Sequence, residues 1–335
     1  MAIVLVTGGS GFLGAHLIVR LLADGHDVRT TVRTVDRRDD VERMLQAAGA
    51  PTGAVGYVET DLLSDEGWSI AMAGADYVLH AASPFPAVQP EDEDELIRPA
   101  VEGTLRVLRF ARDAGVKRVV VTSSIAAVGY GRPPLDRPFT EDDWTDVDGP
   151  GVTPYAKSKT LAERAAWDFV AEHPGLELAV VNPVGIFGPV LGPDLSTSIQ
   201  LIQRVLSGGM PVVPPLWSNT VDVRDVADLE VRVMTAPEAA GQRYLAVAGE
   251  PIPFAAIART LREKLGTDAD KVPRIALPGW LFRVLAPLVP SARGVASQLR
   301  VVRRVSNARA RALGWTPRSN EEAVVATAES LLALR

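Results

Sequence analysis

The chain has 335 residues, of which 47% are hydrophobic, so it is long enough to bury a large core in one or two domains. Its formal net charge of −6 argues against the basic surface that nucleic acids require, and we expect no nucleic-acid partner. The absence of cysteine excludes disulfides, thiolate catalysis and cysteine-ligated metals, and it fits a reducing cytoplasm.

The first residues enter an apolar strand pattern directly. No basic segment, apolar h-region or cleavage site precedes residues 3–7, so secretion is not expected. The most membrane-like stretch, residues 276–290, is too short to span a bilayer and is interrupted by Pro278 and Pro287. We therefore expect a cytoplasmic protein with no membrane partner.

The strand pattern at residues 3–7 runs into a cluster of glycines. Gly8, Gly11 and Gly14 let the backbone turn tightly, approach a pyrophosphate closely and pack a new helix against its strand. An apolar helical pattern over 13–21 follows, and its N-terminus would offer free N–H groups to phosphates. This context favours dinucleotide binding, and the alternative is an ordinary strand-to-helix turn.

Apolar strand patterns then alternate with helical patterns along the chain. The predicted strands are residues 3–7, 27–32, 55–59, 76–80, 118–122 and 177–181, followed by a helix around 222–236 and a strand around 243–247. Such alternation is typical of right-handed βαβ crossovers and of a parallel sheet covered on both faces. We predict an α/β fold, a Rossmann-type doubly wound parallel sheet.

The texture of the sequence changes after Pro183, where Gly and Pro become frequent. We predict a smaller, discontinuous C-terminal substrate-binding domain. The dinucleotide-binding domain would comprise residues 1–183 and about 222–248, and the substrate-binding domain about 184–221 and 249–335.

Tyr155 and Lys159 form a Tyr-x-x-x-Lys pair in a segment with a helical pattern. Residues four apart share one face of a helix, so the ammonium would lie beside the phenol. A neighbouring positive charge favours the phenolate and lowers a pKa that is ordinarily about 10, which would make Tyr155 a usable acid or base near neutral pH. The alternative is a surface contact on a helix.

Ser123 and Ser124 follow the strand at 118–122 and therefore lie at the carboxyl edge of the sheet, where open α/β folds bind ligands. A hydroxyl there can hydrogen-bond a substrate oxygen, although a polar strand end or helix cap is the alternative. No Gly-x-Ser-x-Gly motif surrounds the two serines, and none of the four histidines has an evident partner role. Hydrolysis is disfavoured.

Taken together, Thr7-Gly8-x-x-Gly11-x-x-Gly14, Ser124 and Tyr155-x-x-x-Lys159 resemble the extended short-chain dehydrogenases/reductases of the NAD-dependent epimerase/dehydratase superfamily. The likeness covers essentially the full length and is strongest to the dihydroflavonol 4-reductase-like and carbonyl reductase branch. Segments that carry it are Asp27–Arg33, Asp61-Leu62, His80–Pro84, Val119–Ser124, Asn182-Pro183, Gly188-Pro189 and Leu313–Ser319.

The resemblance implies a role for each catalytic residue. Tyr155 would protonate a carbonyl oxygen, Ser124 would help to hold that oxygen, and Lys159 would tune Tyr155 while bonding the nicotinamide ribose. Ser123 would lie nearer the cofactor. The hydride would come from the cofactor.

The end of the second predicted strand indicates which nicotinamide cofactor is bound. Residues 28–35 contain no carboxylate that would accept the adenosine ribose hydroxyls, whereas Arg29, Arg33, Arg37 and Arg38 suit a 2′-phosphate. The family likeness maps Arg33 onto a phosphate-binding arginine, with Arg37 as its helper. We predict NADP(H); the alternative is that these arginines are solvated loop charges.

The residues that we expect at the cofactor are Thr7, Gly8, Ser10, Gly11, Phe12, Leu13, Gly14, Arg33, Arg37, Asp61, Leu62, Ala81, Ala82, Ser83, Thr122, Ser123, Tyr155, Lys159, Asn182, Pro183 and Val184. Among them, Asp61 and Leu62 should lie by the adenine, and residues 182–184 by the nicotinamide. No metal is expected.

The residues expected around the reaction centre are mostly apolar: Pro84, Phe85, Val128, Tyr130, Phe187, Leu191 and Trp217. Such a pocket favours a hydrophobic aldehyde, ketone or diketone. Core packing is the alternative, above all for Val128 and Leu191. Gly129 stands where dihydroflavonol reductases carry a polar substrate-reading residue, and Asp143-Trp144 only faintly matches the cinnamoyl-CoA reductase block, so those two substrates are not favoured.

The sequence therefore predicts an NADPH-dependent carbonyl reductase that acts reversibly on a small molecule, as a monomer or homodimer. Two alternatives within the superfamily are a nucleotide-sugar epimerase and a hydroxysteroid-type dehydrogenase. A third alternative is a non-catalytic NADP-sensing regulator, which the presence of both Tyr155 and Lys159 disfavours.

Overall fold

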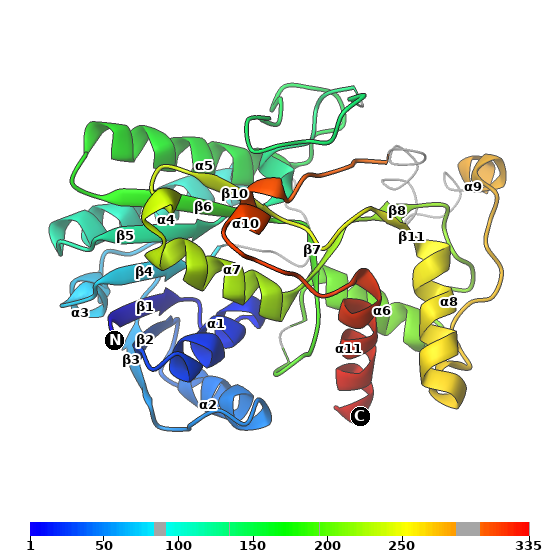
Figure 1. The fold of residues 1–335 in the computed structure, drawn as a ribbon, viewed down its shortest axis with the longest axis horizontal. Helices are drawn as coiled ribbons and strands as arrows, with labels where there is room; N and C mark the ends of the chain where they lie inside the picture. Colours follow the sequence, from blue (N-terminus) through cyan, green and yellow to red (C-terminus); the bar gives the residue numbers. More distant parts are fainter. Residues whose placement is uncertain (84–91, 134, 194, 286–301, 335) are drawn as a thin grey trace.

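The computed structural model describes residues 1–83, 92–133, 135–193, 195–285 and 302–334. Its centre is a seven-stranded parallel sheet with the strand order β10-β6-β5-β4-β1-β2-β3 (Figure 1). The strands are β1 (Ile3–Thr7), β2 (Asp27–Val32), β3 (Val55–Glu59), β4 (Tyr77–His80), β5 (Arg118–Thr122), β6 (Glu177–Pro183) and β10 (Arg243–Ala246). The chain reverses its direction of progress between β1 and β4, and the predicted doubly wound sheet is confirmed.

Helices cover both faces of this sheet because its strands are apolar on both sides (Figure 1). Val4 and Val6 of β1 pack on the side of α1 and α7, whereas Leu5 packs on the side of α3, α4 and α5. The flanking helices are α1 (Phe12–Ala23), α2 (Arg37–Ala47), α3 (Trp68–Met72), α4 (Asp94–Asp113), α5 (Pro154–Glu172) and α7 (Val223–Thr235).

A second hydrophobic cluster lies beyond the carboxyl edge of the sheet and joins α6, α8 and α11 (Figure 1). The remaining elements are β7 (Gly185–Phe187), α6 (Thr197–Leu206), β8 (Trp217–Ser218), β9 (Thr220–Asp222), β11 (Ile252–Pro253), α8 (Phe254–Leu265), α9 (Gly279–Leu285), α10 (Ala308–Ala312) and α11 (Asn320–Ala333), with short 3-10 turns η1 (Ile125–Ala127), η2 (Pro237–Ala239) and η3 (Gly266–Ala269). This cluster is built from the segments assigned above to the substrate domain; the boundaries of that domain stay a prediction.

Residues 302–307 lie against the sheet domain. Phe139 pairs with this segment in both directions, since its N–H donates to the carbonyl of Arg304 at 2.8 Å and its carbonyl accepts from Ser306 at 2.9 Å. Farther on, the indole of Trp315 is buried and donates to the backbone carbonyl of Asp225 at the start of α7, at 2.8 Å. The C-terminal part of the chain is thus anchored to the sheet domain.

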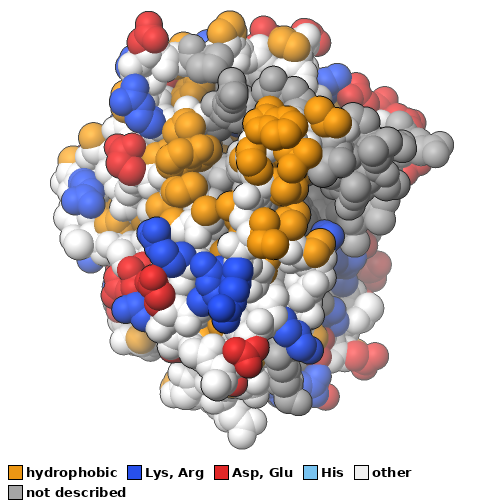
Figure 2. Space-filling view, turned by 90° about the vertical axis from the view of Figure 1, so that its right-hand side faces the viewer, with side chains coloured by type: hydrophobic (Ala, Val, Ile, Leu, Met, Phe, Trp, Pro, Cys, Tyr) orange, Lys and Arg blue, Asp and Glu red, His pale blue; other side chains and the backbone are white. Residues whose placement is uncertain are grey.

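Large apolar side chains are exposed at the end of the molecule that carries α9 and β8. They are Trp217, Ile275, Trp280 and Val284. Figure 2 looks onto this end and shows hydrophobic side chains gathered there. Within the described residues, none of the helices combines the length and the apolar composition that crossing a membrane requires.

Candidate active site

The glycine turn between β1 and α1 has no room for side chains. Gly8 has φ +72°, and a Cβ on Gly14 would lie 2.2 Å from the carbonyl oxygen of Gly8. Helix α1 starts at Phe12, and its N-cap residue is Gly11, which has no side chain that could cap the N–H groups of the first turn. The turn therefore offers a close backbone approach and unsatisfied N–H groups, which are the features that a dinucleotide's phosphates need.

Thr7 connects this turn to the end of β4. Its hydroxyl accepts a hydrogen bond from the backbone N–H of Ala82 at 3.1 Å and lies 2.8 Å from Nδ1 of His80. Burial, together with the positive charge of Lys159, lowers the pKa of His80 to about 3, so its ring is neutral. The bond fixes the start of the 81–83 segment, which the sequence assigns to the cofactor.

Both predicted phosphate-binding arginines lie on the chain that follows β2. Arg33 is exposed. Arg37, in the first turn of α2, forms an ion pair with Asp40 at 2.9 Å and donates from Nη2 to the carbonyl of Ser10 in the glycine turn at 3.4 Å. The structure thus brings Arg37 to the turn.

The two predicted adenine-side residues lie after β3. Asp61 is exposed, and its Oδ1 accepts a hydrogen bond from the N–H of Leu63 at 2.8 Å. The side chain of Leu62 packs against Gly103 of α4, where an added Cβ would lie 3.0 Å from it. Leu62 is thereby held close to the sheet, while the Asp61 carboxylate caps a turn.

Helix α5 presents Tyr155 and Lys159 because its start is well defined. The hydroxyl of Thr153 caps it by accepting from the N–H of Ala156 at 3.2 Å, and Pro154 occupies the first helical position. Residues 155, 159 and 163 are spaced by four and follow one another along a single face of the helix.

Tyr155 hydrogen-bonds with Ser124 across the gap between α5 and the end of β5. Ser124 also caps the 3-10 turn η1, since its Oγ accepts from the N–H of Ala126 at 3.1 Å. Burial raises the pKa of Tyr155 and outweighs the lowering effect of the bond with Ser124. The expectation that Lys159 lowers the pKa of this phenol is therefore wrong for the structure as it stands, because desolvation dominates.

The ammonium group of Lys159 is shifted in the opposite direction. Burial lowers its pKa to about 8, even though the carboxylates of Glu163 and Glu230 act to raise it. Lys159 therefore loses its charge only slightly above neutral pH, whereas an exposed lysine keeps it to about 10.

Glu163 is a fully buried carboxylate below the Tyr155–Lys159 pair, and the sequence analysis missed it. It accepts hydrogen bonds from Ser123 Oγ at 2.5 Å, from Asn182 Nδ2 at 2.7 Å and from Arg243 Nε at 2.6 Å. The hydroxyl of Ser123 is thus directed into this network. The only signal in the sequence was the continued four-residue spacing from Tyr155 and Lys159.

Asn182 connects the same network to the catalytic edge. Its amide also donates to the backbone carbonyl of Ser124 at 3.2 Å, so the chain after β5 is tied to β6. Its Oδ1 is buried and has no hydrogen-bond partner among the described residues. An unsatisfied buried acceptor at this edge fits a ligand that donates to it. Pro183 and Val184, predicted for the nicotinamide side, are buried beside it.

Glu230 of α7 is a second buried carboxylate that the sequence analysis missed. Its Oε1 accepts from the hydroxyl of Thr122 at 2.7 Å, and its Oε2 is buried with no hydrogen-bond partner among the described residues. Burial raises its pKa to about 8, against the effects of Thr122 and Lys159. The hydroxyl groups of Thr122 and Ser123 thus both donate hydrogen bonds to buried carboxyl groups, those of Glu230 and Glu163.

The predicted substrate-pocket residues fall into different surroundings. Pro84 and Phe85 lie outside the described residues. Val128 is buried in a small cluster with Phe139 and Leu245, and Phe187 is buried in the α6–α8–α11 cluster. Tyr130 and Leu191 are partly buried, and Trp217 is 45% exposed. Of the described members, Tyr130, Leu191 and Trp217 therefore have accessible surface that a ligand could contact.

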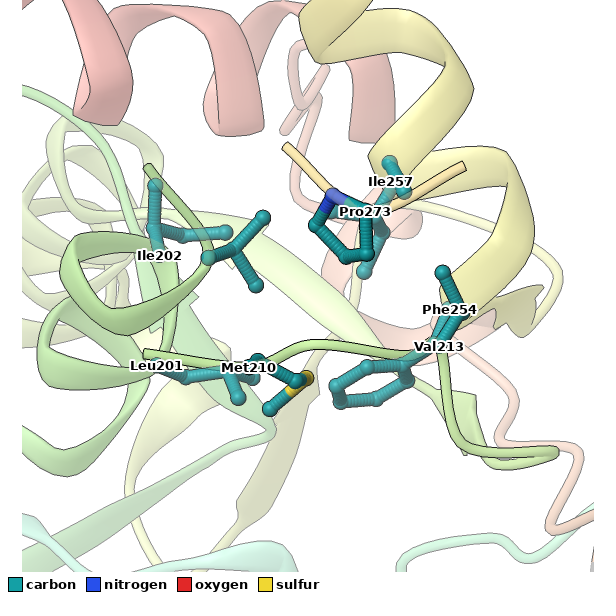
Figure 3. A pocket seen from close by; sticks show the side chains of 9 residues that line it. Leu201, Ile202, Met210, Val213, Phe254, Ile257 and Pro273 are labelled. Atoms are coloured by element: carbon teal, nitrogen blue, oxygen red, sulfur yellow. The ribbon is translucent and has the colours of Figure 1, made fainter. Parts of the chain in front are cut away.

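A small apolar cavity in the second cluster is not a substrate site. It lies between α6 and α8 and is lined by Leu201, Ile202, Val205, Met210, Val213, Phe254, Ile257, Ala258 and Pro273 (Figure 3). Its volume of about 10 Å³ is the space of roughly one water molecule. No polar group converges on it (Figure 3).

Comparison with known proteins shows which family the chain belongs to. Residues 4–248 match the model of the NAD dependent epimerase/dehydratase family. The chain is 36% identical over 248 residues to cinnamoyl-CoA reductase CAD2 from Medicago truncatula, which covers 72% of this chain and 75% of the relative. It is 33% identical over 299 residues to ketoreductase azaE from Aspergillus niger, covering 82% and 86%.

Among solved structures, the chain is similar to the yeast methylglyoxal/isovaleraldehyde reductase Gre2 complexed with NADPH. The TM-score is 0.82 and the sequence identity is 26%, with 99% of this chain and 98% of that chain covered. The match therefore includes the second cluster as well as the sheet.

Replacing Glu163 with Ala is expected to lower the free energy of unfolding by about 3–5 kcal/mol, because the charge of Arg243 would stay buried without the carboxylate that pairs with it. Urea denaturation followed by circular dichroism measures the change. Glu263→Ala is the matched control, since Glu263 pairs with Arg259 at 3.9 Å on an exposed face of α8. The same small loss in both variants would contradict the role of Glu163.

Proposed function

The chain belongs to the NAD dependent epimerase/dehydratase family, and we propose that within this family it is an NADPH-dependent reductase of hydrophobic aldehydes, ketones or diketones. It would act reversibly, through Ser124, Tyr155 and Lys159. The observation that supports this most is the hydrogen bond between Tyr155 and Ser124 at the carboxyl end of β5, with Lys159 one helical turn beyond Tyr155.

The residues around the glycine turn fit NADPH. The turn between β1 and α1 would receive the pyrophosphate, Arg33 and Arg37 would receive the adenosine 2′-phosphate, and the free Oδ1 of Asn182 would accept from the nicotinamide end. The bound cofactor would supply the hydride. The NADPH complex of the similar yeast reductase supports this choice of cofactor.

Tyr155 would act as the proton donor in reduction. Because burial raises its pKa, the phenol keeps its proton at neutral pH and can give it to a carbonyl oxygen. Ser124 would hydrogen-bond the same oxygen from the other side. Lys159, charged below about pH 8, would stabilise the phenolate that is left on Tyr155 after the transfer.

The substrate class rests on the pocket residues and on the names of relatives. Tyr130, Leu191 and Trp217 offer a mostly apolar lining, which suits a hydrophobic carbonyl compound. The relatives include a cinnamoyl-CoA reductase, a ketoreductase and an aldehyde reductase. Arginines rather than an acid after β2 disfavour a nucleotide-sugar epimerase that keeps NAD bound.

Tyr155→Phe is expected to lower the kcat for reduction of an aryl ketone or aldehyde by about 10²–10⁴-fold, because the proton donor is lost. The Kd for NADPH should barely change. The loss of NADPH absorbance gives kcat, and fluorescence titration gives the Kd for NADPH. Tyr77→Phe, at the opposite edge of the sheet, is the control and should retain full activity. An active Tyr155→Phe enzyme would exclude Tyr155 as the donor; no turnover by the wild-type enzyme would favour a regulator.

The rate of reduction at saturating NADPH is expected to fall as pH rises through about 8, because Lys159 is protonated below this value and neutral above it. Steady-state rates between pH 6 and 10 measure the inflection. Glu230 also titrates near this pH, so Glu230→Gln separates the two groups. The inflection should move to lower pH in that variant, since the carboxylate raises the pKa of Lys159; its disappearance would assign it to Glu230 instead.

Arg33→Asp is expected to weaken NADPH binding far more than NADH binding, because a carboxylate there repels the 2′-phosphate. Fluorescence titration with each cofactor gives the two Kd values. Arg259→Asp, the same charge change on the exposed face of α8, should leave both unchanged. Equal weakening of NADPH and NADH would remove Arg33 from this role.

A further inference from the structure

Arg303 lies against the segment that follows the proposed catalytic serine. Its guanidinium carbon is 4.3 Å from the centroid of the Tyr130 ring, and its Nε donates to the carbonyl oxygen of Gly129 at 3.0 Å. These two residues come five and six positions after Ser124, directly after the turn η1. Arg303 is more than 170 residues away in sequence and reaches them through the tertiary fold alone.

The absence of a side chain at position 129 makes room for this arginine. A Cβ on Gly129 would lie 3.7 Å from Cδ of Arg303, in ordinary contact, so a longer side chain would compete with Arg303 for the same space. The arginine stem thus borders the position where residue 129 would otherwise extend. Its guanidinium continues over the face of Tyr130, where a cation interacts favourably with the ring.

The backbone of Arg303 is fixed on both sides. Its carbonyl accepts from Nδ2 of Asn219, next to β9, at 2.9 Å. The carbonyl of the next residue, Arg304, accepts from the N–H of Phe139. The Oδ1 of Asn219 is buried and has no partner among the described residues. Arg303 therefore projects from a held segment, and an unsatisfied acceptor lies nearby.

Arg303 differs from the buried arginines of this protein in having no acid partner. Arg118 and Arg243 are buried and pair with Glu177 and Glu163 at 2.7 and 2.6 Å. Within the described ranges, no carboxylate lies within 4.0 Å of Arg303, and only its Nε donates a hydrogen bond to the protein. The terminal nitrogens of Arg303 are accessible and keep their hydrogen-bonding capacity, so a carboxylate could take both of them through two parallel hydrogen bonds.

Arg303 also contacts a residue that interacts with the reacting groups. Tyr130, on which it stacks, acts electrostatically to raise the pKa of Tyr155, and Tyr155 bonds with Ser124. Tyr130 therefore links Arg303 to the surroundings of the proposed proton donor.

We propose that Arg303 binds a carboxylate of the substrate, so that the preferred substrates are keto acids with an apolar body. This inference rests on the proposed reductase function and names its substrate class. The apolar body would contact the pocket, the carbonyl would face Ser124 and Tyr155, and the carboxylate would take both terminal nitrogens of Arg303.

The test compares α-, β- and γ-keto acids with their methyl esters at saturating NADPH. For at least one acid, the wild-type kcat/KM should exceed that of its ester. In Arg303→Gln, kcat/KM for that acid should fall about 10- to 100-fold, mainly through KM, because charged hydrogen bonds are lost. Turnover of the ester should change less than about twofold, and Arg303→Lys should recover part of the loss.

Arg304→Gln is the matched control, because its guanidinium is exposed and donates to the carbonyl of Asp136. It should leave both substrates unaffected. An equal fall in kcat/KM for the acid and the ester in Arg303→Gln, with unchanged NADPH affinity and thermal unfolding, would overturn the proposal. Arg303 would then act only by holding the side chain of Tyr130 in place. Wild-type preference for every ester would overturn it while leaving the reductase function standing, as would turnover of aryl ketones or aldehydes without turnover of any acid. No turnover of any of these carbonyl compounds would overturn both.

Discussion

One buried carboxylate ties helix α5 to the sheet. Glu163 of α5 accepts from Ser123 after β5, from Asn182 of β6 and from Arg243 of β10, and it is completely inaccessible to solvent. Hydrogen bonds to a charged acceptor are strong and directional, and a buried one cannot exchange them for water. The angle and depth of α5 are thereby fixed, and with them the positions of the Lys159 ammonium one turn earlier and of the Tyr155 phenol two turns earlier.

Burial, rather than pairing, sets the protonation of the groups around this helix. It raises the pKa of Tyr155 and of Glu230, and it lowers the pKa of Lys159 and of His80. Each shift favours the neutral form, as expected for groups removed from water. The outcome is a phenol that holds its proton and an ammonium that keeps its charge only up to about pH 8.

In the proposed function, the elements beyond the sheet would contribute the substrate side of the site. The similarity to the yeast reductase extends over 99% of this chain, so the second cluster is part of the shared architecture. The segment at 302–307 lies against the sheet domain and brings Arg303 to Gly129 and Tyr130. The arginine stem passes in ordinary contact distance of the position where a side chain at 129 would begin.

The sequence by itself determined the strands, the glycine turn and the Tyr155–Lys159 pair, because each is a local pattern of apolar period, backbone freedom or helical spacing. Strand β6 runs two residues past its predicted end, β4 begins one residue later and β10 ends one residue earlier than predicted, and the short strands β7, β8, β9 and β11 were not predicted. Family membership followed from the order of these motifs. The tertiary structure decided what depends on distant partners: Arg243 meets Glu163 from 80 residues away, Arg303 meets Gly129 from 174, and Glu230 meets Thr122 from 108. It also decided that the pKa of Tyr155 rises, because desolvation is a property of the folded core and leaves no mark on the spacing of residues.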